Sequence, residues 1–143
     1  MKLKIKEFLV IFVSLTLSCG HPARDRAGIE RAMQNYNRHI ISMNLDSISS
    51  SYSEDGELGN IAKGRDSIRI FLTKFASFKV LSQLSTTDSI VINQDTAVQK
   101  GMYRQTVIVP VNDTVSVKGL FTARWIWQDG EWEIKHLETI PIK

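Results

Sequence analysis

Residues 124–140, RWIWQDGEWEIKHLETI, decide how the rest of the chain folds. They predict two β-strands joined by a tight turn, because Asp129-Gly130 stands between two runs of alternating aromatic and polar residues. Side chains of a strand alternate between its two faces, so each arm has one mainly apolar face. On the first arm that face comprises Phe121, Ala123, Trp125 and Trp127. On the second arm it comprises Trp132, Ile134, His136, Glu138 and Ile140.

Three long β-rich segments lead into this hairpin, at residues 79–93, 96–109 and 114–127. Gly101 and Gly119 interrupt strand patterns, and we expect them at bulges or bends that curl the sheet. Tyr103 and Arg104 point to opposite faces of the second segment. The pattern leaves open which of the two faces inward.

Helical periodicity dominates the part of the chain before the strands. Residues 26–44 carry an apolar stripe at spacings of three and four that includes Tyr36, and residues 45–52 predict a short second helix that buries Tyr52. A short strand is expected at residues 57–61. A third helix begins at residues 64–67, and its wide apolar stripe comprises Ile68, Phe71, Leu72, Phe75 and Phe78.

This order of elements predicts an α+β domain. We expect three N-terminal helices packed on a strongly curved antiparallel sheet of four long strands plus a short one. At 143 residues the chain is long enough for one domain with a core of its own.

The first eighteen residues have the layout of a secretory signal peptide, with basic Lys2, Lys4 and Lys6 followed by an apolar run at residues 8–17. The sequence Leu-Thr-Leu-Ser-Cys at residues 15–19 resembles a bacterial lipobox, although Thr16 replaces the usual leucine. This resemblance implies that Cys19 becomes the lipidated first residue of the mature protein. We therefore expect a signal peptide at 1–18, a tether at 19–25 and a domain at 26–143, held at the bacterial cell envelope. The alternative is an ordinary secreted protein with an incidental cysteine.

The leader also accounts for most of the net positive charge of the chain. It holds three lysines and Glu7, so the rest of the chain carries a net charge of +1 instead of +3. A nucleic-acid-binding protein would need clustered basic residues on one face, and the sequence has no such cluster. A lone cysteine cannot form an internal disulfide.

The segment MNLDSISSSYSEDGELGNIAKGRDSIRIF and the strand pair W-x-W-Q-D-G-E-W-E-I-K-H are similar to the nuclear transport factor 2-like superfamily, in particular its SnoaL-like and ketosteroid-isomerase-like branch. The resemblance spans residues 26–142. It implies a cone: a curved sheet wrapped around a long helix, with a mostly apolar pocket at the wide end. Because one fold hosts isomerases, cyclases, dehydratases and binding modules, function has to be argued from the site.

The isomerase branch uses a tyrosine of the first helix, a proton-transferring carboxylate after the second helix and a protonated acid on a late strand. Transferred without gaps, these roles fall on Tyr36, Asn60 and approximately Ala123. An amide is no proton acceptor near neutral pH and alanine donates no hydrogen bond. The resemblance therefore implies that two of the three catalytic positions are vacant.

His136 remains the main candidate for acid–base chemistry, because its ordinary pKa lies near neutral pH. It is weighed against a buried histidine with one fixed hydrogen bond, and that structural role is favoured. Glu138 could orient its ring or lie at a solvated strand end. Glu54 and Asp55 suit a catalytic or metal site less well than a polar turn. Arg104 and Arg124 would indicate an anionic ligand only if they faced the pocket.

The sequence thus favours a non-catalytic, membrane-anchored cone domain that binds a small apolar or amphipathic molecule or a partner protein, with no cofactor and no metal. The alternative is a cyclase- or isomerase-type enzyme that uses Tyr36 with His136. A homodimer through the exposed sheet face is a further expectation. The predicted pocket comprises Tyr36, Tyr52, Asn60, Trp125 and His136.

Overall fold

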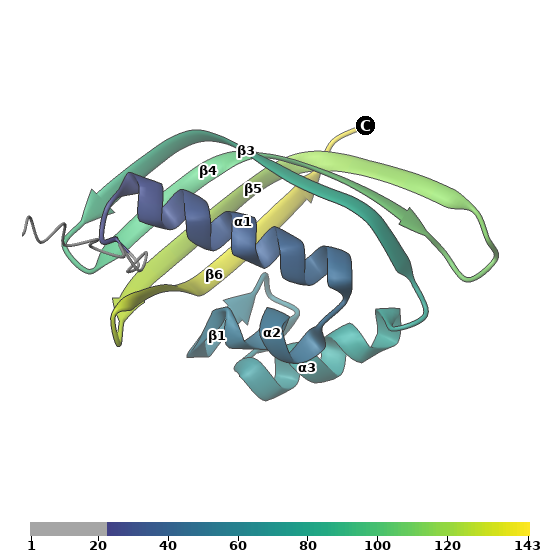
Figure 1. Ribbon diagram of the computed structural model, residues 1–143, viewed down its shortest axis with the longest axis horizontal. Coiled ribbons are helices and arrows are strands. Elements are labelled where there is room, and N and C mark those ends of the chain that lie inside the picture. Colours follow the sequence, from purple (N-terminus) through teal and green to yellow (C-terminus); the bar gives the residue numbers. More distant parts are fainter. Residues whose placement is uncertain (1–22) are drawn as a thin grey trace, which may run out of the picture.

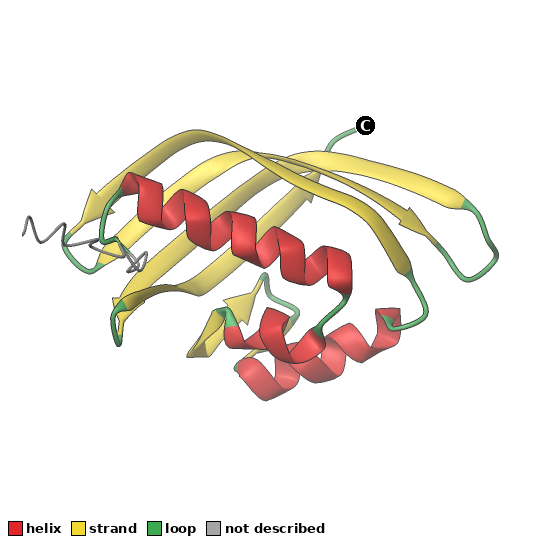
Figure 2. Ribbon diagram, in the orientation of Figure 1, coloured by secondary structure: helices red, strands yellow, loops and turns green. Residues whose placement is uncertain are grey.

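The structure, a computed structural model, describes residues 23–143. The predicted signal peptide, the lipidation site at Cys19 and the first part of the tether lie outside the described residues. Within them, helices come first and long strands follow (Figures 1 and 2). The helices are α1 (Arg26–Ser42), α2 (Leu45–Ser50), α3 (Arg65–Leu72) and the 3-10 helix η1 (Thr73–Phe75). The strands are β1 (Tyr52–Leu58), β2 (Ala62–Lys63), β3 (Lys79–Asn93), β4 (Thr96–Ile108), β5 (Thr114–Gln128) and β6 (Glu131–Pro141).

The six strands form one curved sheet in the order β2-β1-β6-β5-β4-β3. The helix α1 lies along its concave side, while α2 and α3 sit together near β1 (Figure 1). The predicted α+β class, the curved sheet and the four long strands are confirmed. The sheet is mixed and not wholly antiparallel, because β1 pairs with β6 in parallel.

The first helix begins and ends where local chemistry permits. The Asp25 side chain accepts a 2.8 Å hydrogen bond from the Gly28 amide and so caps the N-terminus. Met43, in the left-handed conformation, ends the helix after Ser42. Ile29, Met33 and Tyr36 on the predicted stripe are buried against the sheet.

The region between α2 and α3 differs from the prediction. The second helix stops at Ser50, and Tyr52 opens β1 in register with Ile134 of β6. Serine side chains favour this early stop, because Ser50 and Ser51 hydrogen-bond back to helical carbonyls and weaken the helix. The predicted short strand at 57–61 is therefore replaced by β1 and the two-residue β2. Tyr52 is buried as expected, but on a strand.

The third helix is amphipathic with a narrower buried face than predicted. Only Ile68 of its stripe is buried. Phe71, Phe75 and Phe78 are half-buried and stack edge-to-face on one another, with ring centroids 5.4 and 5.3 Å apart. The backbone turns into η1 at Thr73, so the stripe does not stay on one side of a single helix.

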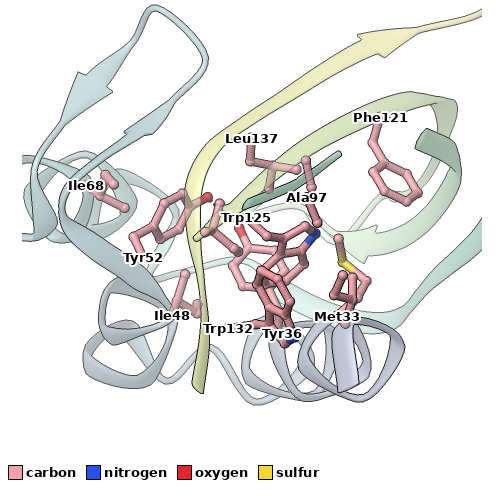
Figure 3. Packing of buried hydrophobic residues seen from close by; sticks show 13 residues of the cluster. Met33, Tyr36, Ile48, Tyr52, Ile68, Ala97, Phe121, Trp125, Trp132 and Leu137 are labelled. Carbon is pink, nitrogen blue, oxygen red and sulfur yellow. Dashed lines mark hydrogen bonds between the residues drawn. The ribbon is translucent and has the colours of Figure 1, made fainter. Parts of the chain in front are cut away.

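The hydrophobic core lies between α1 and the concave face of the sheet, with Trp125 near its middle (Figure 3). The Trp125 indole donates to Gln99 Oε1 at 3.1 Å, and Gln99 Nε2 donates to Thr87 Oγ1 at 2.8 Å. This satisfies the polar groups of two fully buried side chains. Gly101 lies beside a register shift between Thr87 and Ser89, as the glycine pattern predicted.

Candidate functional site

A cavity of about 230 Å³ lies between the C-terminal half of α1 and the concave face of the sheet, and we call it the cone cavity. The helix α1 contributes Met33, Tyr36, Asn37 and Ile40. The sheet contributes Leu58, Gln83, Ser85, Tyr103, Gln105, Val117, Phe121, Leu137 and Thr139. Every lining residue is apolar or neutral, so among residues 23–143 the cavity wall carries no formal charge.

The polar groups gather on the β3–β4 side of the cone cavity. Gln83 stands directly opposite Gln105 in the strand register, and Ser85 stands opposite Tyr103. Ser85 Oγ donates to Asn37 Oδ1 of α1 at 3.1 Å, which ties the helix to this wall. Gln83 Oε1 is buried and has no hydrogen-bond partner. Leaving a buried acceptor unpaired costs free energy, so Gln83 Oε1 is a position where a hydrogen-bond donor would stabilise the protein.

Tyr36, which lines the cone cavity, contacts the fully buried Tyr52, which does not line it. Their hydroxyl oxygens are 3.0 Å apart and joined by a hydrogen bond, and their rings pack edge-to-face. Burial raises the pKa of Tyr36 to about 12, partly offset by the hydrogen bond from Tyr52. Burial also raises the pKa of Tyr52 well above its usual value, with a further contribution from Tyr36. Near neutral pH both phenols stay protonated, so they serve as hydrogen-bond donors and not as bases.

His136 does not face the cone cavity, which corrects the predicted pocket. The pairing of β5 with β6 shifts between Arg124 and Trp125, because β6 holds one extra residue at Lys135. This bulge moves the alternation by one position, so Leu137 faces inward while His136 and Glu138 face outward. His136 Nδ1 lies 3.0 Å from Glu57 Oε2 on β1. Hydrogen bonds from His136 and from Lys63 lower the pKa of Glu57.

Three other predicted positions also lie away from the cone cavity. Asn60 is exposed in the turn between β1 and β2, and the residue that β1 contributes to the cavity is the apolar Leu58. Ala123 is fully buried in the core. Trp125 is buried as well and borders a different cavity. Of the five predicted pocket residues only Tyr36 lines the cone cavity, and Tyr52 contacts it from the core behind the wall.

That different cavity is a larger polar groove of about 500 Å³ between α1, α2 and the β5–β6 hairpin. Its walls include the exposed side chains of Arg31, Asn35 and Glu131. Two of its carboxylates are already paired. Asp46 accepts from Arg69 at 2.5 Å, and Glu133 accepts from Arg65 at 2.6 Å. The groove is therefore lined by charged side chains, whereas the wall of the cone cavity carries none.

The remaining charged candidate residues lie on the protein surface, away from the cone cavity. Glu54 and Asp55 are exposed residues of β1 and not of a turn, and Asp55 pairs with Lys135. The hydrogen bond from Lys135 lowers the pKa of Asp55. Arg104 and Arg124 are exposed, while Tyr103 is the residue of its pair that faces inward.

Residues 23–143 hold no group of three or more potential metal-ligating side chains. In the same part of the chain, no helix is long and apolar enough to cross a membrane. Sequence reasoning missed Gln83, Gln105 and Ser85, which form the polar wall. Their only signal is the period of two along β3 and β4, and polar residues on that period are normally expected to face solvent.

Three solved structures are similar to this chain. A protein of unknown function from Mycobacterium tuberculosis is 20% identical, with a TM-score of 0.71 over 80% of this chain and 74% of that one. A proposed scytalone dehydratase from Novosphingobium aromaticivorans is 20% identical, with a TM-score of 0.70 over 80% and 82%. An NTF2-like protein with a cystatin-like fold from the same bacterium is 18% identical, with a TM-score of 0.69 over 83% and 82%.

At these identities the likeness to solved structures concerns the fold alone. No curated protein matches the sequence. A family match carries the assignment further, because the SnoaL-like domain matches residues 22–138, which is most of the chain. That span includes every residue that lines the cone cavity except Thr139. The chain therefore belongs to the SnoaL-like domain family.

Proposed function

We propose that this protein is a non-catalytic, membrane-anchored domain that binds a small, uncharged and mostly apolar molecule in the cone cavity. The observation that carries the proposal is the cavity wall, where apolar side chains and neutral hydrogen-bonding groups line a space of about 230 Å³ between α1 and the sheet. Ligand pockets are mostly apolar concavities with a few placed polar groups, and this wall has that composition.

The wall suits binding better than proton transfer. A general base needs a pKa near the working pH, and the ionisable groups on this wall are the phenols of Tyr36 and Tyr103. Burial holds the pKa of Tyr36 at about 12, so its proton stays in place. The enzyme alternative combined Tyr36 with His136. Tyr36 of α1 packs on the inner face of the sheet, whereas the His136 side chain points away from the outer face. The geometry gives that pair no shared substrate.

Filling the cavity tests the proposal. We expect the purified protein to bind an uncharged, environment-sensitive naphthalene dye and to shift its emission. Val117→Trp should abolish the shift, because Val117 lines the cavity. Lys118→Trp, the adjacent outward-facing change on the same strand, should retain it. Dye binding that survives in Val117→Trp would contradict the proposal, provided that circular dichroism shows both variants folded.

The membrane anchor belongs to the same proposal and rests on the lipobox-like sequence around Cys19. Acyl chains on Cys19 would hold the domain at the bacterial cell envelope. We expect mass spectrometry of the mature protein to find an acylated Cys19 at the N-terminus. An unmodified Cys19, or cleavage at another position, would contradict the anchor and leave the ligand site unaffected.

The outer face of the sheet supports a homodimer as a second candidate role. Met102, Leu120 and Ile140 lie in register on β4, β5 and β6 and are 41%, 45% and 56% exposed. A two-fold interface uses the same patch on both copies, so this apolar row can pack against itself. Sedimentation should give twice the monomer mass, and Leu120→Arg should give the monomer. A monomeric native protein would contradict this role.

A further inference from the structure

We infer that the ligand of the cone cavity is a neutral molecule of about two fused rings that donates a hydrogen bond to Gln83. This inference rests on the proposed function and specifies the ligand class of the same site. Its basis is the single buried side-chain atom without a partner in the described part of the chain, Gln83 Oε1. Gln83 lines the cavity from β3.

In the structure no neighbouring side chain donates a hydrogen bond to Gln83 Oε1. Ser85, the next inward residue of β3, already donates its hydroxyl hydrogen bond to Asn37. Gln105 stands directly opposite in the register and also lines the cavity, so two carboxamides lie side by side on this wall. Rotation of a carboxamide about its last side-chain bond exchanges oxygen and nitrogen, and that torsion has a broad two-fold profile. The rotation turns the Gln83 oxygen toward a donor in the cavity and moves its Nε2 amide to the buried position.

The size of the cavity limits the ligand. Its volume of about 230 Å³ exceeds the ~150 Å³ of a cavity that accepts benzene and falls below the ~300–1,000 Å³ of pockets for drug-sized molecules. A molecule of two fused rings suits this range. Met33, Phe121 and Leu137 supply the apolar surface for its body.

Charge limits the ligand further. Without a cationic side chain on the wall, a carboxylate or phosphate entering the cavity would lose its hydration with no compensating ion pair. The same argument excludes an ammonium group, because the wall holds no carboxylate. A hydroxyl or an amide N–H satisfies Gln83 Oε1 at a smaller desolvation cost. The ligand class is therefore a neutral bicyclic alcohol, phenol or amide.

Three probes of one shape separate these contributions: naphthalene, naphthol and naphthoate. By equilibrium dialysis near neutral pH, we expect naphthol to bind about tenfold more tightly than naphthalene, since pairing an unsatisfied buried acceptor is worth on the order of this factor. Naphthoate should bind more weakly than naphthalene. Gln83→Leu should reduce the naphthol-to-naphthalene ratio to about one and retain naphthalene. Gln34→Leu, an exposed change on α1, should keep the ratio.

Each result has a distinct meaning. If neither naphthalene nor naphthol binds, the proposed function fails. If the two bind equally in the native protein, or if Gln83→Leu keeps the preference, the role of Gln83 fails while the ligand site stands. If naphthoate binds most tightly, the neutral ligand class is wrong. Gln83→Leu should also unfold at an equal or higher urea concentration, because it removes an unpaired buried acceptor. A large loss of stability would contradict the assignment of that oxygen as unpaired.

Discussion

Tyr36 and Tyr52 depend on each other, because each hydroxyl is buried and their mutual hydrogen bond is the one that either makes among the described residues. Either Tyr→Phe change alone leaves the other hydroxyl unpaired, which costs about 1–3 kcal/mol. The double Phe variant removes both polar groups, so it should lose less stability than the sum of the two single changes. Urea unfolding of the native protein, the two single variants and the double variant measures the coupling free energy between the two hydroxyls. Strict additivity would show that each hydroxyl has another partner.

The same pair makes stability depend on alkaline pH. In the unfolded chain a tyrosine loses its proton near pH 10, whereas burial raises the pKa of Tyr36 to about 12 and that of Tyr52 well above its usual value. Between pH 10 and 12 the unfolded state releases protons that the folded state keeps. The free energy of unfolding should therefore decrease as pH rises through this range. Below pH 10 these two groups should contribute no slope.

The double Phe variant is the control for this pH dependence. It lacks both phenols, so its free energy of unfolding should decrease less between pH 10 and 12 than that of the native protein. Urea titrations at several pH values measure both slopes. Equal slopes in the two proteins would show that the alkaline loss does not come from the buried pair.

At the level of elements, the bulge in β6 decides which residues form the site. Strict alternation along the hairpin places His136 with Trp132 and Ile134, and it fails at Lys135, where two residues of β6 pass one position of β5. The period of two correctly assigns Trp132 and Ile134 to the core. A bulge depends on the curvature of the whole sheet, and no residue type at Lys135 announces it.

Other elements show the same division between local and long-range information. The sequence predicts the bounds of β3 and the turn at Asp129-Gly130, since strand composition and turn residues are local signals. It does not predict the parallel pairing of β1 with β6, because that contact joins distant segments. The cavity wall at Gln83 and Gln105 escapes prediction for a related reason. Polar residues of a strand can be assigned to the inward face only when the element that packs opposite them, here α1, is known.

Removing Lys135 tests the importance of the bulge. The deletion restores regular pairing and leaves Ile134 and Leu137 on the inner face, but it removes the local bend of β6. We expect a loss of about 1–3 kcal/mol in unfolding free energy and loss of the naphthalene dye, because the cavity depends on this curvature. Lys135→Ala keeps the bulge and removes the exposed ion pair with Asp55, so it should cost at most about 1 kcal/mol and keep the dye. Equal dye binding in both variants would contradict this role.

Across the whole molecule, the start of the described chain and the cone cavity lie at opposite ends. Trp132 Nε1 donates to the Ala23 carbonyl oxygen at 3.1 Å, and Arg24 pairs with Asp95 in the β3–β4 turn. Gly28 permits this approach, because a side chain there would collide with the Ala23 carbonyl. Gln83, by contrast, lies near the start of β3 (Figure 1). The tether therefore meets the domain far from the ligand site.

Together with the proposed lipid anchor at Cys19, this arrangement predicts how the protein is oriented at a membrane. Four residue steps separate Cys19 from Ala23 and span at most roughly 14 Å, so a lipid on Cys19 would hold the β5–β6 turn close to the membrane. A fluorophore on Gln128→Cys should be quenched strongly by nitroxide-labelled lipids. One on Val111→Cys, in the exposed β4–β5 loop at the far end, should be quenched weakly. Equal quenching at the two positions would show that the tether does not fix the orientation, and a chain that stays off the vesicles would contradict the anchor itself.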